Sequence, residues 1–531
     1  MTKPSQPGSV AIKRPTTSDL NQKMEAADAR VIANPSDPAA YAARAGVYRQ
    51  KSLFREAIAD FTQALEMGSD DMQVLIDRAV CYRRIDEPEL AITDLTQVQM
   101  LEPGNVQAFA QRGLCHLAMA EPSRAIPDFS KAIQLAPDKF PYYFNRAESF
   151  VKAKQYDAAI PDLDKVVSLS PKLAAAYQLR GLCHYHLGQL EPALTDNHKA
   201  VTLEPDNPLY LHNRGVVYFD LNQFKNALVD FEAALKLKPQ QIESICYCGR
   251  VRAKMGKQRE AIKDYDKALT LKPDHIDSLD AKGAALLDLK DYPALDTNDN
   301  LLIKADPQNA SAYYRRGVVS AANKLVEQAL RDFSQAIIRK PDFAIAYEER
   351  ARIHGMRGDK SAATSDLGQA IVHGIDDPVV FALHGRLLKE RGDLDLAISS
   401  YDKAIAGLPE TFELILERGQ IHYKLDHFAL AAADFARCAI TRPNDVGLQF
   451  NLGSASLEAN QYEQAIEAFT KVLGLNRNDA ASYLSRGEAY LANGNPKRAE
   501  DDFKKAFQST RDPQLQEVAG KRLAELSANK S

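Results

Sequence analysis

No run of about eighteen apolar residues occurs in this chain of 531 residues, so the sequence predicts no membrane-spanning helix. Tryptophan is absent, and six cysteines in so long a chain are too few for a disulfide framework. Neither sign of charge dominates, and a net charge of −4 provides no overall attraction to nucleic acid. We therefore expect no membrane insertion and no nucleic-acid partner, and the reduced cysteines favour a cytoplasmic location.

The sequence motifs of enzyme chemistry are missing as well. There is no His-Glu-x-x-His pattern, no Cys-x-x-Cys pair, no phosphate-binding glycine loop and no Gly-x-Ser-x-Gly nucleophile. The eleven histidines are scattered along the chain. His184 and His186 point to different sides of a helix, and His422 and His427 lie across a helix end. We therefore expect no catalytic residues, no metal ligands and no cofactor, and predict that the protein is not an enzyme.

What the chain does contain is a repeat of 34 residues, which recurs fourteen times in register from residue 38 to residue 513. Counting from Pro38, position 8 is Gly or Ala in every copy. Position 20 is Ala in thirteen copies, with Leu295 as the exception, and position 32 is Pro in ten. A fixed period of this length is typical of a solenoid, in which each unit buries its apolar face against its neighbours. Such a chain presents a long surface instead of an enclosed pocket.

Apolar residues three or four apart in each half of the repeat predict two amphipathic helices. Proline at position 32 ends the second helix and begins the next repeat. Small residues at positions 8 and 20 let the two helices cross closely, since a larger side chain would overpack the contact at a cost of about 1–3 kcal/mol. We expect an all-α fold of antiparallel helix pairs. The predicted repeats span 38–71, 72–105, 106–139, 140–173, 174–207, 208–241, 242–275, 276–309, 310–343, 344–377, 378–411, 412–445, 446–479 and 480–513.

These positions resemble the tetratricopeptide repeat family, with small residues at 8, Ala at 20, an aromatic residue at 24, Ala or Val at 27 and Pro at 32. The resemblance covers residues 38–513 and implies a right-handed superhelical solenoid. The family's usual tryptophan at position 4 is replaced by Tyr, Phe, Leu or Ile, with Gln449 as the one polar case. This replacement preserves the packing, so the expected fold is unchanged.

The segments outside the repeats are short. Residues 19–37 are predicted to form an N-terminal capping helix, and residues 514–531 a C-terminal capping helix and tail, because a terminal repeat needs its apolar face covered. Residues 1–18 are rich in Pro, Ser and Thr and contain no acidic residue. They predict a disordered tail, with a targeting signal as the alternative.

Arginine at position 7 occurs together with aspartate at position 23. All ten repeats that have the arginine also have the aspartate, as in Arg44 with Asp60, and most repeats that lack one lack the other. Cys248 with Asp264 is the exception. Paired loss indicates an ion pair between the two helices of one repeat, which fixes their register more than it stabilises them. A row of ligand-binding arginines is the alternative interpretation.

Repeat eight departs from the pattern. It has Leu295 at position 20, Asn298 at position 23 and Asp299 where an aromatic residue is expected. Two interpretations remain open. Either the neighbouring repeats tolerate a frayed helix, or this repeat is a hinge that joins two rigid arms near residues 290–306.

The family resemblance implies that the first helices line a concave face, where positions 2, 5, 6, 9, 12 and 13 meet a ligand. In repeats three to six these positions hold amides, which can pair with a peptide backbone, and apolar residues, which can accept its side chains. The predicted peptide-binding residues are Arg49, Arg83, Arg84, Gln107, Gln111, Phe144, Asn145, Gln178, Leu182, His212 and Asn213.

Two ligand-binding patterns of the family are not matched. Asn145 and Asn213 correspond to the central asparagine of a carboxylate clamp, but the residues around them do not, and a continuous asparagine ladder is absent. We therefore expect a non-catalytic scaffold that binds one or more proteins through extended segments. The alternatives are a co-chaperone that receives an acidic chaperone tail at Arg49, Arg83 and Arg84, and a regulatory subunit of an enzyme complex.

Overall fold

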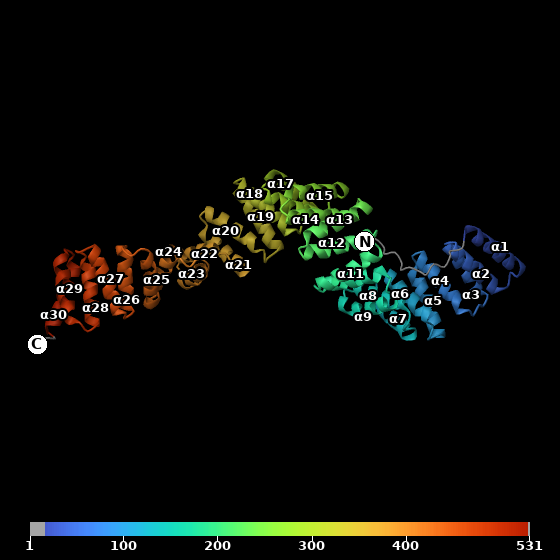
Figure 1. The fold of residues 1–531 in the computed structure, drawn as a ribbon, viewed down its shortest axis with the longest axis horizontal. Coiled ribbons are helices and arrows are strands. Elements are labelled where there is room, and N and C mark those ends of the chain that lie inside the picture. Colours follow the sequence, from blue (N-terminus) through green and yellow to red (C-terminus); the bar gives the residue numbers. More distant parts are fainter. Residues whose placement is uncertain (1–15, 529–531) are drawn as a thin grey trace. The chain divides into compact units, whose positions relative to one another are not determined.

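The computed structural model describes residues 16–528, and every regular element within that range is an α-helix. The chain divides into two compact units, Met1–Ala285 and Leu286–Ser531, each built of stacked helices (Figure 1). Among the described residues, no helix is both long and apolar enough to cross a membrane. The prediction of an all-α solenoid is confirmed.

The helices of the first unit are α1 (Thr17–Ala33), α2 (Pro38–Gln50), α3 (Phe54–Glu66), α4 (Met72–Arg84), α5 (Pro88–Leu101), α6 (Val106–Ala118), α7 (Pro122–Leu135), α8 (Phe140–Lys152), α9 (Tyr156–Leu169), α10 (Ala174–His186), α11 (Leu190–Leu203), α12 (Pro208–Asp220), α13 (Phe224–Leu237), α14 (Ile242–Lys254) and α15 (Gln258–Leu271). The boundary between the units falls inside α16 (Ile276–Asp288). The second unit contains α17 (Tyr292–Ala305), α18 (Ala310–Ala322), α19 (Val326–Arg339), α20 (Ala344–Met356), α21 (Lys360–Val372), α22 (Pro378–Arg391), α23 (Leu394–Gly407), α24 (Phe412–Lys424), α25 (Phe428–Thr441), α26 (Val446–Glu458), α27 (Tyr462–Leu475), α28 (Ala480–Ala492), α29 (Pro496–Ser509) and α30 (Pro513–Ala528).

Consecutive helices pack in pairs within each unit. In the first unit α2 packs on α3 and the series continues to α14 on α15, and in the second unit α18 packs on α19 and the series continues to α28 on α29. The second helix of a pair also contacts the first helix of the next, as α3 contacts α4. At the two ends α1 contacts α2 and α30 contacts α29. Each pair therefore buries its apolar faces against its neighbours, as a solenoid requires.

Polar residues mark where many of the first helices begin. Asp37, Asn105 and Asn309 each accept a hydrogen bond from a backbone N–H two or three residues further on. Such a cap satisfies one of the N–H groups that the first helical turn leaves without a partner. The cap follows two residues after the proline of position 32, so the end of one repeat and the start of the next are specified together.

The turn inside each helix pair contains a residue with positive φ at position 15. In five repeats it is glycine, as at Gly188 with φ of 74°, and in nine it is another residue, as at Ala120 with φ of 58°. The left-handed region disfavours residues that carry a Cβ atom. The tertiary packing of the two helices therefore overrides local preference in those nine turns.

The closest approach within a pair brings position 8 against the side chain of position 24. A methyl group added to Gly215 would lie 2.7 Å from the Phe231 ring, and one added to Gly487 would lie 2.5 Å from the Phe503 ring. Both rings are fully buried. At these two crossings a side chain larger than glycine at position 8 would overlap the ring that packs on it.

The first helix begins earlier than the sequence predicts. Thr16 and Asp19 form a capping box, in which each side chain accepts a hydrogen bond from the backbone of the other. Thr17 and Ser18, which the composition places in a disordered tail, are therefore already helical. Residues 1–15 of that predicted tail lie outside the described residues.

Candidate functional site

Each arginine at position 7 forms three hydrogen bonds, which we call the arginine clamp. Arg146 donates from Nε and Nη2 to the carboxylate of Asp162, at 2.7 Å each, and from Nη1 to Ser130 Oγ at 3.0 Å. Asp162 lies on the partner helix α9, whereas Ser130 lies on α7 of the preceding pair. One side chain therefore joins three helices of two consecutive repeats.

The clamp recurs at all ten arginines. Every one of them pairs with the aspartate at position 23 and also contacts position 25 of the preceding repeat or, for Arg44, Asp28 of α1. The aspartates are buried, and hydrogen bonding to Asp162 raises the pKa of Arg146. The predicted ion pair is confirmed. The alternative of ligand-binding arginines is wrong, because these guanidinium groups are already bound inside the protein.

The exception at Cys248 has a structural explanation. Arg252, one helical turn further along α14, donates to Glu232 at 2.8 Å and to Asp264. Asp264 and Glu232 are the positions that a clamp arginine would bind in this repeat. The clamp is therefore kept, with its arginine displaced by four residues.

Repeat eight is held together in a different way. Asp299, at the position of the usual aromatic residue, is fully buried and accepts two hydrogen bonds of 2.9 Å from Arg315 on α18. The Arg315 side chain is only 5% exposed. The helix α17 that carries Asp299 runs unbroken from Tyr292 to Ala305. The expectation of a frayed helix is therefore wrong, whereas the hinge stays a prediction.

The predicted peptide-binding residues lie on α2, α4, α6, α8, α10 and α12 of the first unit. These first helices contact one another in order, α2 with α4, α4 with α6 and so on to α12. We call the surface that they form with these residues the first-helix face. It is continuous from one repeat to the next because the helices are neighbours in space as well as in the repeat order.

Two of the predicted cations on this face are held by the next first helix. Arg49 forms an ion pair of 2.7 Å with Asp77 on α4. Arg83 donates from Nη2 to the Gln111 side chain on α6 at 3.2 Å. Arg49 and Gln111 are therefore engaged in contacts within the protein, and they are less available to a ligand than the sequence suggests.

His212 is also held within the fold. Its Nδ1 lies 2.8 Å from Ser244 Oγ on α14, and its ring packs beside Phe231 and Tyr247 with ring centroids 5.5 and 5.6 Å away. Burial lowers the pKa of His212 to about 4, so the ring is neutral at physiological pH. His212 is therefore part of an aromatic cluster and not a charged contact for a ligand.

The two apolar residues predicted for the face sit at the edge of the interior. Phe144 and Leu182 are half-buried and pack against a buried cluster that includes Leu163 and Cys183. Their exposed portions remain on the first-helix face. Each of these side chains therefore packs partly against the core and offers its remaining surface as apolar contact area to a bound segment.

Four amides on the face form no side-chain hydrogen bond to any described residue. They are Gln107 on α6, Asn145 on α8, Gln178 on α10 and Asn213 on α12, one from each of four consecutive first helices. Gln107 is exposed and the other three are half-buried. Each amide has both a donor and an acceptor to offer, which is what the backbone of an extended segment can satisfy.

Arg83 lacks an anionic partner. Its Nε is buried without a hydrogen bond, and among residues 16–528 no carboxylate forms an ion pair with it. Burial lowers the pKa of Arg83, and the neighbouring charge of Arg84 lowers it further. A carboxylate brought by a ligand would offset this desolvation.

The cysteines and histidines are placed for packing. All six cysteines are buried and unpaired, and burial raises the pKa of Cys81 to about 11 and that of Cys183 to about 12. These thiols stay protonated and poorly nucleophilic. His422 and His427 have their Nδ1 atoms 3.4 Å apart, but no cluster of three metal-ligating groups occurs in the described part of the chain.

Several solved structures are similar to parts of this chain. A MamA protein from Desulfovibrio magneticus RS-1 is 27% identical, and the match covers 33% of this chain and 98% of that protein with a TM-score of 0.32. YrrB, described as a TPR protein with an unusual peptide-binding site, is 20% identical over 35% of this chain and 97% of its own, with a TM-score of 0.32. A chain of the APC/C hetero-tetramer Cut9–Hcn1 is 15% identical over 88% of this chain and 98% of its own, with a TM-score of 0.35.

Protein-family models match several parts of the chain. One model described as tetratricopeptide repeat matches residues 42–105, 111–174, 144–208, 383–446 and 450–514, and two others of the same description match residues 208–241 and 249–275. Stacked repeats of this kind present extended surfaces and support a role as a protein-interaction scaffold. Because the first of these models alone matches more than half of the sequence, the chain belongs to the tetratricopeptide repeat family.

Proposed function

We propose that the protein is a non-catalytic scaffold that binds an extended segment of a partner protein on its first-helix face. The observation that supports this function best is the set of four amides at Gln107, Asn145, Gln178 and Asn213. Each is accessible, each lies on a different first helix, and none is used within the protein. The six buried, reduced cysteines support a cytoplasmic location for the complex.

The spacing of the helices suits an extended segment. Packed helices lie about 8–10 Å apart, and an extended chain advances about 3.3 Å per residue. Every third residue of such a segment would therefore meet the amide of the next first helix. Backbone hydrogen bonds of this kind do not depend on the side chains of the partner, so Phe144 and Leu182 would contribute the selectivity.

We further propose that fourteen repeats, with the boundaries given above, make up residues 38–513, between capping helices in 19–37 and 514–531. The helix bounds support this division, since each window contains one first helix and one second helix. The positive φ at position 15 recurs in every window as well.

A second candidate function is the binding of an acidic segment, such as a chaperone tail, near Arg83 and Arg84. The half-buried guanidinium of Arg83, which lacks a carboxylate partner, favours it. This site adjoins the four amides through Gln111, which Arg83 already contacts. An acidic residue at one end of an extended segment would satisfy both candidates at once.

The test is selection of a display library of random twelve-residue peptides on the purified chain. Selected peptides are then titrated against the Asn145→Ala/Asn213→Ala variant by fluorescence anisotropy. Losing two hydrogen bonds should weaken binding by about tenfold or more. The matched control is Gln63→Ala/Gln97→Ala, which removes two exposed amides from the second helices α3 and α5 and should leave affinity unchanged.

Hydrogen exchange on the complex locates the peptide independently. Protection in α6, α8, α10 and α12 supports the proposal. Peptides that bind both variants equally, or that protect only second helices, would show that another face binds. If the selected peptides are acidic and Arg84→Glu abolishes their binding, the acidic-segment function is the correct one.

A further inference from the structure

Repeat eleven lacks the arginine clamp, and a hollow of about 480 Å³ lies where the clamp would be. His384 occupies position 7, Ser400 position 23 and Gly368 position 25 of the preceding repeat. The imidazole Nδ1 lies 3.0 Å from Ser400 Oγ. All three residues line the hollow. They are smaller than the arginine, aspartate and polar residue that fill this place in the ten clamped repeats, so space is left between α21, α22 and α23.

Loss of the clamp does not require a hollow. In repeat thirteen the corresponding residues are Leu452, Ala468 and Ala436, and the leucine is only 6% exposed. In that repeat the Leu452 side chain occupies the space that the arginine fills in a clamped repeat. Repeat eleven instead retains polar groups at these positions and leaves them accessible from the hollow.

The walls of the hollow combine two cationic side chains, Lys403 and Arg391, with hydroxyl groups and an apolar rim. Lys403 lies with its ammonium 5.2 Å from the centroid of the Phe381 ring. Ser399 lines the hollow beside it. Val372 and Leu396, at the rim, are 73% and 58% exposed. No carboxylate is among the residues that line this hollow.

The carboxylates nearby are already neutralised. Asp366 is bound by its clamp arginine at 2.7 Å, and Asp402 is bound by Arg418 at 2.6 Å. Arg391, which also lines the hollow, is paired with Asp393. Lys403 forms no ion pair within residues 16–528, so the hollow holds one uncompensated positive charge.

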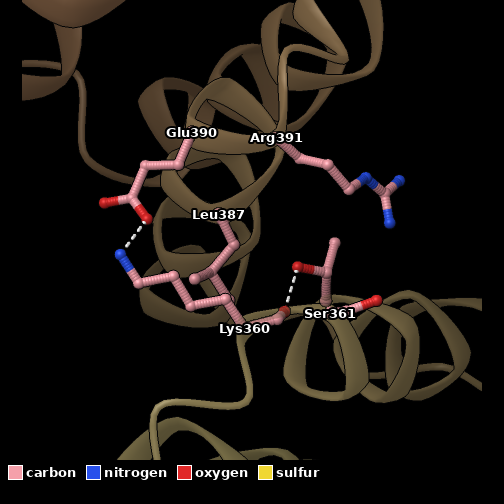
Figure 2. A pocket seen from close by; sticks show the side chains of 6 residues that line it. Lys360, Ser361, Leu387, Glu390 and Arg391 are labelled. Atoms are coloured by element: carbon pink, nitrogen blue, oxygen red, sulfur yellow. Dashed lines mark hydrogen bonds and ion pairs between the residues drawn. The ribbon is translucent and has the colours of Figure 1, made fainter.

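A second hollow of about 370 Å³ adjoins the first and shares Thr364 and Arg391 with it. Figure 2 shows its walls, where Lys360 reaches Glu390 and Arg391 extends in the opposite direction from the end of α22. The Lys360–Glu390 ion pair measures 2.6 Å, so the charges in this part are balanced. Because the two hollows share part of their walls, we treat them as one groove, with its uncompensated charge at the Lys403 end.

We propose that this groove, which we call the clamp-free groove, binds a partner-protein segment with an acidic side chain flanked by apolar residues. The carboxylate would meet Lys403 and accept a hydrogen bond from Ser399, while the flanking side chains would cover Val372 and Leu396. An apolar rim that is more than half exposed is better covered by a chain segment than by a small carboxylate. The groove lies in the second unit, so this site is independent of the first-helix face.

The probes are blocked, fluorescein-labelled pentapeptides Gly-X-Glu-Z-Gly in which X and Z are Val, Leu, Ile or Phe. They are titrated against the full-length chain, and a matched set carries Gln in place of Glu. The decisive variant is His384→Arg/Ser400→Asp, which installs the arginine–aspartate pair of the ten clamped repeats, without the contact to position 25, and places larger side chains in the hollow. Peptides with Glu should bind the natural chain about tenfold more tightly than they bind this variant. The peptides with Gln should bind both proteins weakly.

A surface variant tests the charge without altering the interior. Lys403→Glu should abolish binding of the Glu peptides. Lys505→Glu is the matched control, because Lys505 also lies at position 26 with its ammonium 5.4 Å from the ring at position 4, Tyr483, but in a repeat that keeps its clamp. This control should bind as the natural chain does.

Three results would overturn the proposal. One is that no Glu peptide distinguishes the natural chain from His384→Arg/Ser400→Asp, with circular dichroism showing the variant folded. Another is equal weakening by Lys403→Glu and Lys505→Glu, which would mean a general charge effect. A third is that isovalerate alone binds as tightly as the peptides and is lost with Lys403→Glu, which would assign the groove to a small carboxylate.

Discussion

At the residue scale, the sizes of the side chains at positions 8 and 24 of a repeat vary together. Glycine at position 8 accompanies most of the aromatic rings, as Gly215 accompanies Phe231, because a Cβ atom would overlap the ring. Three of the four alanines at this position accompany the smaller leucine, as Ala147 accompanies Leu163. At most crossings the two side chains therefore share a limited volume, with the smaller residue at position 8 facing the larger ring.

We predict that Gly215→Ala destabilises the protein by about 1–3 kcal/mol, since the new methyl group overlaps a buried ring. The double variant Gly215→Ala/Phe231→Leu should recover most of this loss, because it recreates the pairing of Ala147 with Leu163. Chemical denaturation of the three proteins measures the effect.

The control for this prediction is Gly46→Ala, since Gly46 lies in helix α2 with nothing within 4 Å of an added methyl group. This change should stabilise by about 0.5–1 kcal/mol through helix propensity. If Gly215→Ala is also stabilising, the ring is not held where the structure places it.

At the element scale, two helices depend on polar groups that they bury. Helix α12 presents His212 to Ser244 of the next first helix, in a setting where burial keeps the ring neutral. Helix α17 buries Asp299 and relies on Arg315 of α18 to neutralise it. In both cases the neighbouring helix supplies the group that pairs with the polar side chain.

The half-buried His212 makes stability depend on pH. Because burial lowers the pKa of His212 to about 4, below its usual 6.5, the unfolded chain binds a proton that the folded chain does not. The contribution of His212 is therefore complete above pH 6.5 and is lost as the pH falls towards 4, by up to about 3 kcal/mol.

The measurement for this prediction is the free energy of unfolding between pH 4 and 7.5 for the natural chain and His212→Asn. The asparagine cannot titrate in this range, so the difference between the two profiles isolates the histidine. Parallel profiles for the two proteins would contradict the neutral state of His212 in the folded protein.

For α17 we predict that Arg315→Leu destabilises by about 3–5 kcal/mol, because it leaves the carboxylate of Asp299 buried without its cation. The double variant Asp299→Phe/Arg315→Leu restores the usual aromatic residue at position 24 and should lie within about 1 kcal/mol of the natural chain. Thermal unfolding followed by circular dichroism compares the proteins. An additive loss in the double variant would show that the two residues act separately.

At the scale of the whole molecule, stability is a sum over neighbouring repeats. Within each unit, a helix pair contacts the pairs before and after it, and a clamp joins two consecutive repeats. A local defect should therefore spread to adjacent repeats and no further. The hinge predicted near residues 290–306 also concerns the whole molecule. Uniform hydrogen-exchange protection through repeats seven to nine would contradict this prediction.

We predict that Arg146→Ala raises hydrogen exchange in α7 to α10. The variant leaves the buried carboxylate of Asp162 without its arginine and removes the hydrogen bond to Ser130. Helices of the second unit, such as α28, should exchange at their natural rates. Exchange measured by mass spectrometry on both proteins gives the profile along the chain. An increase spread evenly over all helices would mean that the solenoid unfolds as one cooperative unit.

Part of the candidate site could be predicted from the sequence. Which of its side chains are engaged within the protein depends on contacts between repeats. The periodic sequence predicted the pairing of Arg146 with Asp162, since it follows from positions within one repeat. The first-helix face was implied by the family resemblance, and its role in binding stays a prediction. The sequence could not separate the engaged His212 from the available Asn213. That distinction depends on Ser244, which belongs to the following repeat and lies within hydrogen-bond distance of the imidazole because the two first helices lie side by side.

The sequence by itself determined the all-α solenoid, its helix pairs and its family, because a 34-residue period repeats the same local information in every unit. Only the tertiary structure decided which departures from the pattern are compensated. It placed Arg252 in the role of the missing clamp arginine, paired Asp299 with Arg315 and left the hollow beside His384. The physical reason is that these outcomes depend on the volumes and charges that meet between consecutive repeats, which no single repeat specifies.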